Sequence, residues 1–237
     1  MFAVLVLLPA SAWAYRPFVS TDAAVADPRE VEIELGYFNL ARTGTTNTFT
    51  TPGVVLNYGL VRNVELVGEF RLDGSPHVDI TDPALSLKGV LREGVLQDKT
   101  GLSVAVEGSL LLPSTLSGER GAGFETVGIV SGRVATVTLH VNGGGGLDRA
   151  GHGFGIWGVI GELPLHPKVR LVGEVNGESI ERQRPNNSGL LGVIWQPTSR
   201  NLFLDVGVRH GISSAAPDWQ VTVGLTFGFS LARDGPR

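Results

Sequence analysis

Pairs of charged side chains lie four residues apart in short apolar segments, and this even spacing is the first feature that could carry chemistry. In VELVGEF, Glu65 and Glu69 alternate with apolar residues, and in VRLVGEV, Arg170 and Glu174 do the same. Successive side chains of a β-strand point to opposite faces, so this spacing gathers the charges on one face. Acidic side chains around a water-filled pore favour cations. The same charges could instead pair across strands and stiffen a wall, and both interpretations stay open.

The polar positions of these segments are predicted to face one common interior. Their acids outnumber their bases, which predicts a mild preference for cations. The predicted pore-lining residues are Glu32, Glu34, Glu65, Glu69, Arg71, Lys88, Glu107, His140, Asn142, Arg170, Glu174, Asp205 and Arg209.

Hydrolytic chemistry is a weaker hypothesis. A hydrolase would need a serine beside a histidine and an orienting group. His140 and the serines at 103, 109 and 131 supply the residue types, but no G-x-S-x-G motif occurs. The five histidines show no metal-ligand spacing, and the glycine run 143–146 is not followed by a helix that could bind phosphate. We therefore predict no enzyme activity, no cofactor and no metal site, and keep an outer-membrane hydrolase as a third alternative.

The elements that position these residues are short alternating segments separated by turn residues. About twelve strands are predicted, each near the ~10 residues that a tilted strand needs to cross a membrane. The predicted strands are 30–41, 51–60, 62–72, 83–92, 100–112, 122–132, 134–146, 152–163, 167–179, 188–196, 200–210 and 217–231. The predicted fold class is all-β: a single antiparallel transmembrane β-barrel with its apolar face toward lipid.

The connections between these strands alternate in length. Long polar connections are expected at 41–51, 73–83, 113–123, 176–188 and 211–217, with a shorter one at 147–153. Tight turns are expected at VRN, REGVLQDKT, Arg133, PLHPK and PTSRN. Barrels of the bacterial outer membrane have short periplasmic turns and longer outer loops, so both ends of the barrel chain are expected in the periplasm.

A soluble β-sandwich is the structural alternative, because its strands also alternate. Charged residues make up only 18% of the chain, which is low for a sandwich with a wet outer face. Aromatic residues near strand ends would form the interfacial girdles of a membrane barrel. These residues are Tyr58, Phe70, Trp195, Trp219 and Phe229, whereas Trp157 lies in mid-strand.

The first residues carry an export signal. MFAVLVLLPASAWA is apolar and ends in the small-x-small pattern of a cleavage site, so 1–14 is predicted to be a signal peptide. The remaining domains are a periplasmic leader or plug at 15–29, the barrel at 30–231 and a tail at 232–237. Cysteine is absent, which excludes disulfides and thiolate metal sites. No basic cluster indicates nucleic acid, and the expected location is the outer membrane of a Gram-negative envelope.

Three predicted strands are apolar on both faces, which leaves their facing open. They lie near 122–132, 152–163 and 188–196. A partly apolar interior could hold an apolar or aromatic permeant against Ile156, Ile160 or Ile194. It could equally be filled by the wall's own side chains or by the leader.

Several short motifs resemble a known family. The residues Arg16 to Ala23, PGVVLNYGLVRNVEL (52–66), ALSLKGVL (84–91) and LHVNGGGG (139–146) are similar to transporter-like outer-membrane proteins named after the meta-pathway of phenol degradation. The positions that match are Tyr58-Gly59-Leu60, Glu65, Lys88, His140 and Asn142. The resemblance implies a closed barrel and a role in the passage of small molecules, with aromatic ones as one option.

The function expected from the sequence is an outer-membrane channel or porin-like transporter for small molecules. Its expected partners are outer-membrane lipids and a small permeant. The alternative is a closed structural or adhesion-type barrel that does not conduct.

Overall fold

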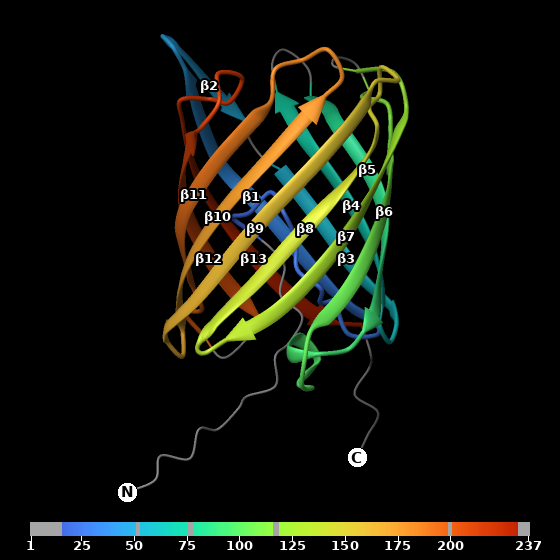
Figure 1. Cartoon of the computed structure of the whole chain (residues 1–237), viewed down its shortest axis with the longest axis vertical. Coiled ribbons are helices and arrows are strands. Elements are labelled where there is room, and N and C mark those ends of the chain that lie inside the picture. Colours follow the sequence, from blue (N-terminus) through green and yellow to red (C-terminus); the bar gives the residue numbers. More distant parts are fainter. Residues whose placement is uncertain (1–15, 51–52, 75–77, 116–118, 199–200, 232–237) are drawn as a thin grey trace, which may run out of the picture.

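The chain folds into a closed antiparallel β-barrel (Figure 1). The computed structural model describes residues 16–50, 53–74, 78–115, 119–198 and 201–231. Each strand pairs with its neighbours in chain order, and β13 pairs with β1 to close the sheet. A closed sheet leaves no unpaired edge, which a structure surrounded by lipid requires. We call the end where β1 begins and β13 ends the base, and the opposite end the rim.

The strands have the following bounds: β1 Glu30–Thr43, β2 Thr46–Thr50, β3 Gly53–Val61, β4 Val64–Gly74, β5 Val78–Arg92, β6 Ser103–Leu111, β7 Gly123–Val134, β8 Val137–Leu147, β9 Gly153–His166, β10 Val169–Ile180, β11 Asn186–Trp195, β12 Leu202–Gly211 and β13 Trp219–Ser230. One short 3-10 helix, η1 Val95–Gln97, lies between β5 and β6.

The barrel wall has twelve strand positions, because β2 and β3 together occupy one of them. Both pair with β1 in a single register, with Thr50 opposite Asn39 and Gly53 opposite Gly36. The predicted all-β fold and its twelve antiparallel strands are therefore confirmed. Within the described residues, no helix is long and apolar enough to cross a membrane.

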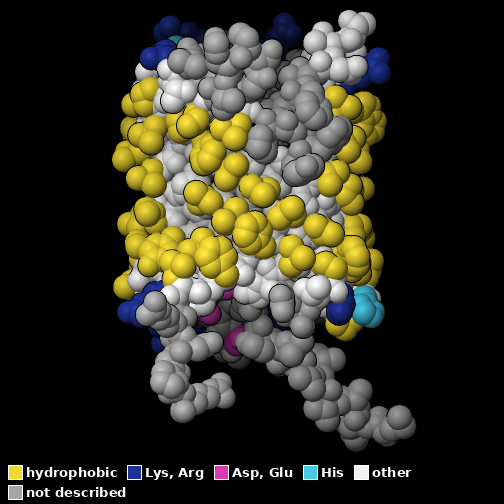
Figure 2. Space-filling view, turned by 180° about the vertical axis from the view of Figure 1, so that it is seen from behind, with side chains coloured by type: hydrophobic (Ala, Val, Ile, Leu, Met, Phe, Trp, Pro, Cys, Tyr) yellow, Lys and Arg dark blue, Asp and Glu magenta, His cyan; other side chains and the backbone are white. Residues whose placement is uncertain are grey.

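Alternation along each strand separates the two faces of the wall. On β4, Glu65 and Val67 are buried inside the barrel, at 5% and 8% exposure. On β5, Lys88 is buried inside while Leu87, the preceding residue, is 52% exposed on the outer face. Figure 2 shows hydrophobic side chains over the outer wall, with Lys, Arg and His side chains gathered toward its two ends. The outer face is thus the apolar one, as the alternation predicts.

The facing of the doubly apolar strands is now resolved. On β9 and β11, Ile160 and Ile194 point inward and are buried. Trp157 and Leu191 point outward, at 45% and 70% exposure. Part of the barrel interior is therefore apolar.

Four predicted connections are wrong in length. The predicted long loop at 41–51 is mostly strand, since β1 and β2 meet at a tight turn where Gly44 has φ of 58°. The predicted tight turn REGVLQDKT is instead part of a longer connection, residues 93–102, that contains η1. The predicted long connections at 73–83 and 176–188 are also mostly strand, because β5 begins at Val78, β10 ends at Ile180 and β11 begins at Asn186. The strict alternation of long and short connections therefore fails at these four places.

The outer face gives a direct prediction. Leu66→Arg is expected to lower folding stability in bilayers, because its charge would face hydrocarbon. Leu66 is the third residue of β4, so the expected cost lies between the ~0–1 kcal/mol of an interfacial position and the ~2–4 kcal/mol of a midplane position. Urea titration in vesicles measures this cost, with Leu66→Ile as the control. A cost equal to that of the control would mean that the face assignment is wrong.

Candidate functional site

Residues 16–29, which we call the leader, run around the inner wall of the barrel. From Arg16 onward, the leader meets β13 and β12 first, then β10 to β7 in descending order, then β5 and β4, and joins β1 from the side of β3. The contacts that define this path are with Thr222, Asp205, Glu174, Asn142, Ser131, Lys88, Glu65 and Gly59. The leader therefore lies along the inner wall of the barrel, and we call the ring of wall that it covers the belt.

Glu174 holds the first part of the leader through its backbone. The Glu174 carboxylate accepts hydrogen bonds from the backbone amides of Val19, at 3.2 Å, and Ser20, at 2.8 Å. Arg209 pairs with the same carboxylate at 2.6 Å. A buried carboxylate is costly unless it is paired and hydrogen-bonded, and this one is both.

Asn142 on β8 binds Thr21 in both directions. Its Oδ1 accepts from the Thr21 amide at 3.1 Å, and its Nδ2 donates to the Thr21 carbonyl at 2.8 Å. The side chain thus pairs with the leader as a neighbouring strand would, and satisfies two backbone groups that are away from bulk water.

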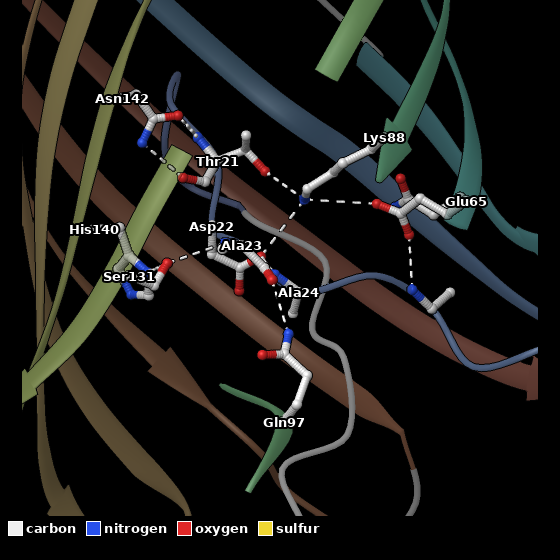
Figure 3. Close-up of polar contacts among 12 residues, drawn as sticks. Thr21, Asp22, Ala23, Ala24, Glu65, Lys88, Gln97, Ser131, His140 and Asn142 are labelled. Carbon is white, nitrogen blue, oxygen red and sulfur yellow. Dashed lines mark hydrogen bonds and ion pairs between the residues drawn. The ribbon is translucent and has the colours of Figure 1, made fainter. Parts of the chain in front are cut away.

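Lys88 lies at the centre of a buried charge cluster (Figure 3). Its ammonium group lies 3.5 Å from Asp22 of the leader and 3.5 Å from Glu65 of β4, and donates to Thr21 Oγ1 at 3.0 Å. Glu65 also accepts from the Ala26 amide at 2.7 Å. One wall cation therefore joins the leader to the wall through two carboxylates.

Ser131 and His140, the residue types singled out for hydrolysis, do come together. His140 Nδ1 lies 2.8 Å from Ser131 Oγ, and His140 Nε2 lies 3.2 Å from Glu162. Ser131 Oγ also accepts from the Ala23 amide at 3.0 Å. Both Ser131 and His140 are 0% exposed. The serine oxygen is therefore engaged by the leader with no open space for an ester, and the trio fits a role in holding Ala23.

Glycines let the leader approach the wall closely. A Cβ at Gly59 would lie 2.0 Å from the backbone oxygen of Asp27, and a Cβ at Gly158 would lie 1.9 Å from Ser20 Oγ. Real side chains never approach this closely, so the wall at these points is shaped for the leader.

The apolar part of the interior is also covered by the leader. Phe18 packs against the cluster of Val172, Ile194 and Phe203. The buried Ala23 packs in a second cluster with Ala105, Val127 and Ile129, joined by Ile156 of β9 and Leu96 of η1. Two of the isoleucines predicted to hold a permeant, Ile156 and Ile194, thus pack against these leader clusters.

The predicted lining residues differ in how far they are buried. Those buried inside the barrel are Glu32, Glu34, Glu65, Lys88, His140, Asn142, Glu174, Asp205 and Arg209. Glu107 and Arg170 are half-buried, and Glu69 and Arg71 are exposed to water. Arg170 pairs with Glu162 at 2.7 Å, and Arg71 pairs with Asp82 at 3.4 Å.

Acids gather between the belt and the rim. Glu69 lies rimward of Glu65 on β4, and Glu178 lies rimward of Glu174 on β10. Glu107 on β6 and Glu125 on β7 occupy similar levels of neighbouring strands and are partly exposed to water. This part of the bore is therefore acidic and wet.

Several residues of the site were not predicted as lining residues. Glu125, Glu162 and Ser131 occupy inward positions, and their alternation with apolar neighbours was the available signal. Arg16 and Asp22 lie in a segment without strand pattern, so no periodicity could place them. Among the described residues, no group of three or more His, Asp and Glu side chains could hold a metal ion.

Solved structures with a similar fold are outer-membrane channels and porins. An outer membrane channel from Pseudomonas putida F1 aligns with a TM-score of 0.60 at 9% identity, covering 87% of this chain and 97% of that one. The NanC porin aligns with a TM-score of 0.59 at 8% identity, covering 83% of this chain and 98% of the porin. Identities this low show the shared barrel fold alone.

Sequence comparison adds no family. No family model matches the chain, and no curated protein matches it. The structural likeness agrees with the closed barrel that the family resemblance implies. Membership of that family stays a prediction.

Proposed function

We propose that the chain is an outer-membrane channel for small molecules, narrowed by its own leader. The observation that carries the proposal is a closed barrel with an apolar outer face and a polar, acid-rich inner face. Lipid outside and water inside account for this distribution, since lumen positions of transmembrane barrels are polar. The likeness to channels and porins supports it.

In this proposal the base faces the periplasm and the rim faces the outside. An even number of strand positions places the start of β1 and the end of β13 at the same end of the barrel, as in bacterial outer-membrane barrels. Outer-membrane lipids surround the apolar wall. The predicted signal peptide at 1–14 and the tail at 232–237 lie outside the described residues.

The wet acids of the rim side support a mild preference for cations. Glu65, Glu174 and Asp205 are paired with Lys88, Arg209 and Arg16, so their charge is largely balanced. Glu69, Glu107, Glu125 and Glu178 meet a permeant before it reaches the belt. Selectivity therefore depends on the rim-side acids more than on the buried ones.

Glu69→Lys is expected to shift the reversal potential in a salt gradient toward anions, because it reverses a charge that faces water inside the bore. Glu181→Lys, in the exposed β10–β11 connection, is the control and is expected to shift it much less. Equal shifts in the two variants would show that the rim-side acids do not set selectivity.

An aromatic or apolar permeant is the finer proposal. Phe18 shows that an aromatic ring fits against Val172, Ile194 and Phe203. When the leader moves aside, this surface faces the lumen and offers a permeant the same contacts. Faster swelling of protein-loaded vesicles in salts of small aromatic ammonium ions than in salts of aliphatic ammonium ions of similar size tests this idea, and equal rates would contradict it.

A closed barrel without conductance remains the second candidate. The observation that favours it is the number of hydrogen bonds and ion pairs that hold the leader inside the bore. Vesicle swelling separates the two candidates, because a closed barrel gives none in any solute. The hydrolase alternative is not proposed, since Ser131 and His140 are sealed beneath Ala23.

A further inference from the structure

The connection between β5 and β6, residues 93–102, folds back against the barrel at its base. We call it the base loop. Leu96 donates its amide to Ser103 Oγ at 3.0 Å, and the Gln97 side chain accepts from the Gly94 amide at 3.0 Å. A Cβ at Gly94 would lie 2.3 Å from the Leu102 carbonyl carbon, so the fold of the loop depends on this glycine.

Ion pairs of Glu93 hold the outer side of the base loop in place. Glu93 pairs with Arg62 at 2.7 Å, with Lys99, and accepts from Asn63 at 2.8 Å. Hydrogen bonds from Lys99 and Asn63 lower the pKa of Glu93 to about 2. A carboxyl with a lowered pKa keeps its contribution above its unfolded pKa and loses it only as the pH falls toward 2. The loop is therefore anchored throughout the neutral and mildly acidic range.

The inner side of the base loop holds the leader. Gln97 Nε2 donates to the Ala23 carbonyl at 2.8 Å, and Leu96 packs against the cluster around Ala23. The Ala23 amide is held from the wall by Ser131. Both polar backbone groups of this one residue are thus bound, one by the wall and one by the loop (Figure 3).

The loop side of this contact opens to the base. A cavity of about 280 Å³ lies between the leader and the loop. It is lined by leader residues 24–28, by Arg62 and Asn63, and by Glu93, Leu96, Gln97 and Asp98 of the loop. Solvent and small probes can therefore enter beside Gln97, whereas the wall contact through Ser131 is fully buried.

We propose that the base loop is a latch on the leader, made by Gln97 and Leu96, and that its release from the base side opens the bore. This inference rests on the proposed function, because a latch matters only if the bore conducts. It assigns regulation to a loop that lies outside the bore and that presents a solvent-open cavity to the periplasm. The anchored Glu93 side is the fixed end, and the Gln97 side is the end that moves.

The test uses the absence of cysteine in the chain. Ala24→Cys places a reporter thiol in the leader at a position that is 8% exposed. Gln97→Glu removes the donor to Ala23 with little change in shape, and Gln97→Ala removes the side chain. The full chain, folded in vesicles and checked by heat-modifiable migration, is treated with a water-soluble maleimide, and single-channel open time is recorded in parallel.

Both Gln97 variants are expected to raise the labelling rate and the open time several-fold. Gln183→Ala, a matched change in the exposed β10–β11 connection, is expected to change neither. Unchanged labelling and open time in both Gln97 variants would overturn the latch while leaving the channel intact. Faster labelling without current in any variant would support the leader contact and overturn the proposed channel function.

Discussion

Gly59→Ala is expected to displace the leader and enlarge the current through the barrel. The added methyl would lie 2.0 Å from the backbone oxygen of Asp27 and 2.7 Å from that of Ala26. Backbone atoms cannot rotate away, so the leader must shift. Overpacking of this kind costs about 1–3 kcal/mol, which urea unfolding in vesicles measures. Single-channel conductance measures the widening of the bore.

Gly68→Ala is the matched control for this change. Gly68 lies on β4, the strand that pairs with β3, and a Cβ there meets no atom within 4 Å. The two variants add the same methyl to neighbouring strands of the same wall. If both left stability and conductance unchanged, the close approach of the leader to Gly59 would be refuted.

The second large effect is expected at Lys88. Lys88→Met keeps the length of the side chain and removes its charge, which leaves Asp22 and Glu65 as buried acids without their cation. Breaking a buried ion pair from one side costs about 3–5 kcal/mol. We expect a loss of that order in unfolding free energy, together with looser binding of the leader.

A double-mutant cycle gives the control for Lys88. Combining Lys88→Met with Glu65→Gln removes one of the two stranded acids, so the double variant should regain part of the lost stability. Simple addition of the two single losses would contradict the pairing. Arg71→Met, which breaks an exposed pair with Asp82 at the rim, is expected to cost about 1 kcal/mol or less.

The wall was predictable because its signal is periodic. Alternation in VELVGEF fixes the facing of Glu65 and Leu66 without any knowledge of their partners. The same rule placed Glu174 and Asn142 inside. It left the facing open where both faces are apolar, as around Ile156, which packs against the cluster that contains Ala23 of the leader.

The leader was not predictable in the same way. Residues 16–29 have no period, because the leader runs around the wall from strand to strand and does not follow a strand of the sheet. Its partners lie far along the sequence: Ser20 binds Glu174, and Ala23 binds Ser131. The plug appeared in the sequence only as one option for a segment without strand pattern. The sequence shows a glycine at position 59, but it does not show that the backbone of Asp27 approaches this glycine closely.

The base loop shows a different limit. The spacing of REGVLQDKT indicated a tight turn, because charged and glycine residues are typical of short hairpins. Two side chains within it, Leu96 and Gln97, instead bind inward toward the leader. Their role depends on a segment more than 70 residues away in sequence, and Gln97 pairs with Ala23 across that separation.

The central claim is that a conducting bore is narrowed by the leader along its inner wall, and single-channel current through the folded full chain tests it most directly. The unmodified protein and Gly59→Ala are compared in planar bilayers across a salt gradient. The account predicts small, cation-preferring steps for the first and larger steps for the second. Silence from both proteins, each with the heat-modifiable migration of a folded barrel, would contradict it and identify a closed barrel.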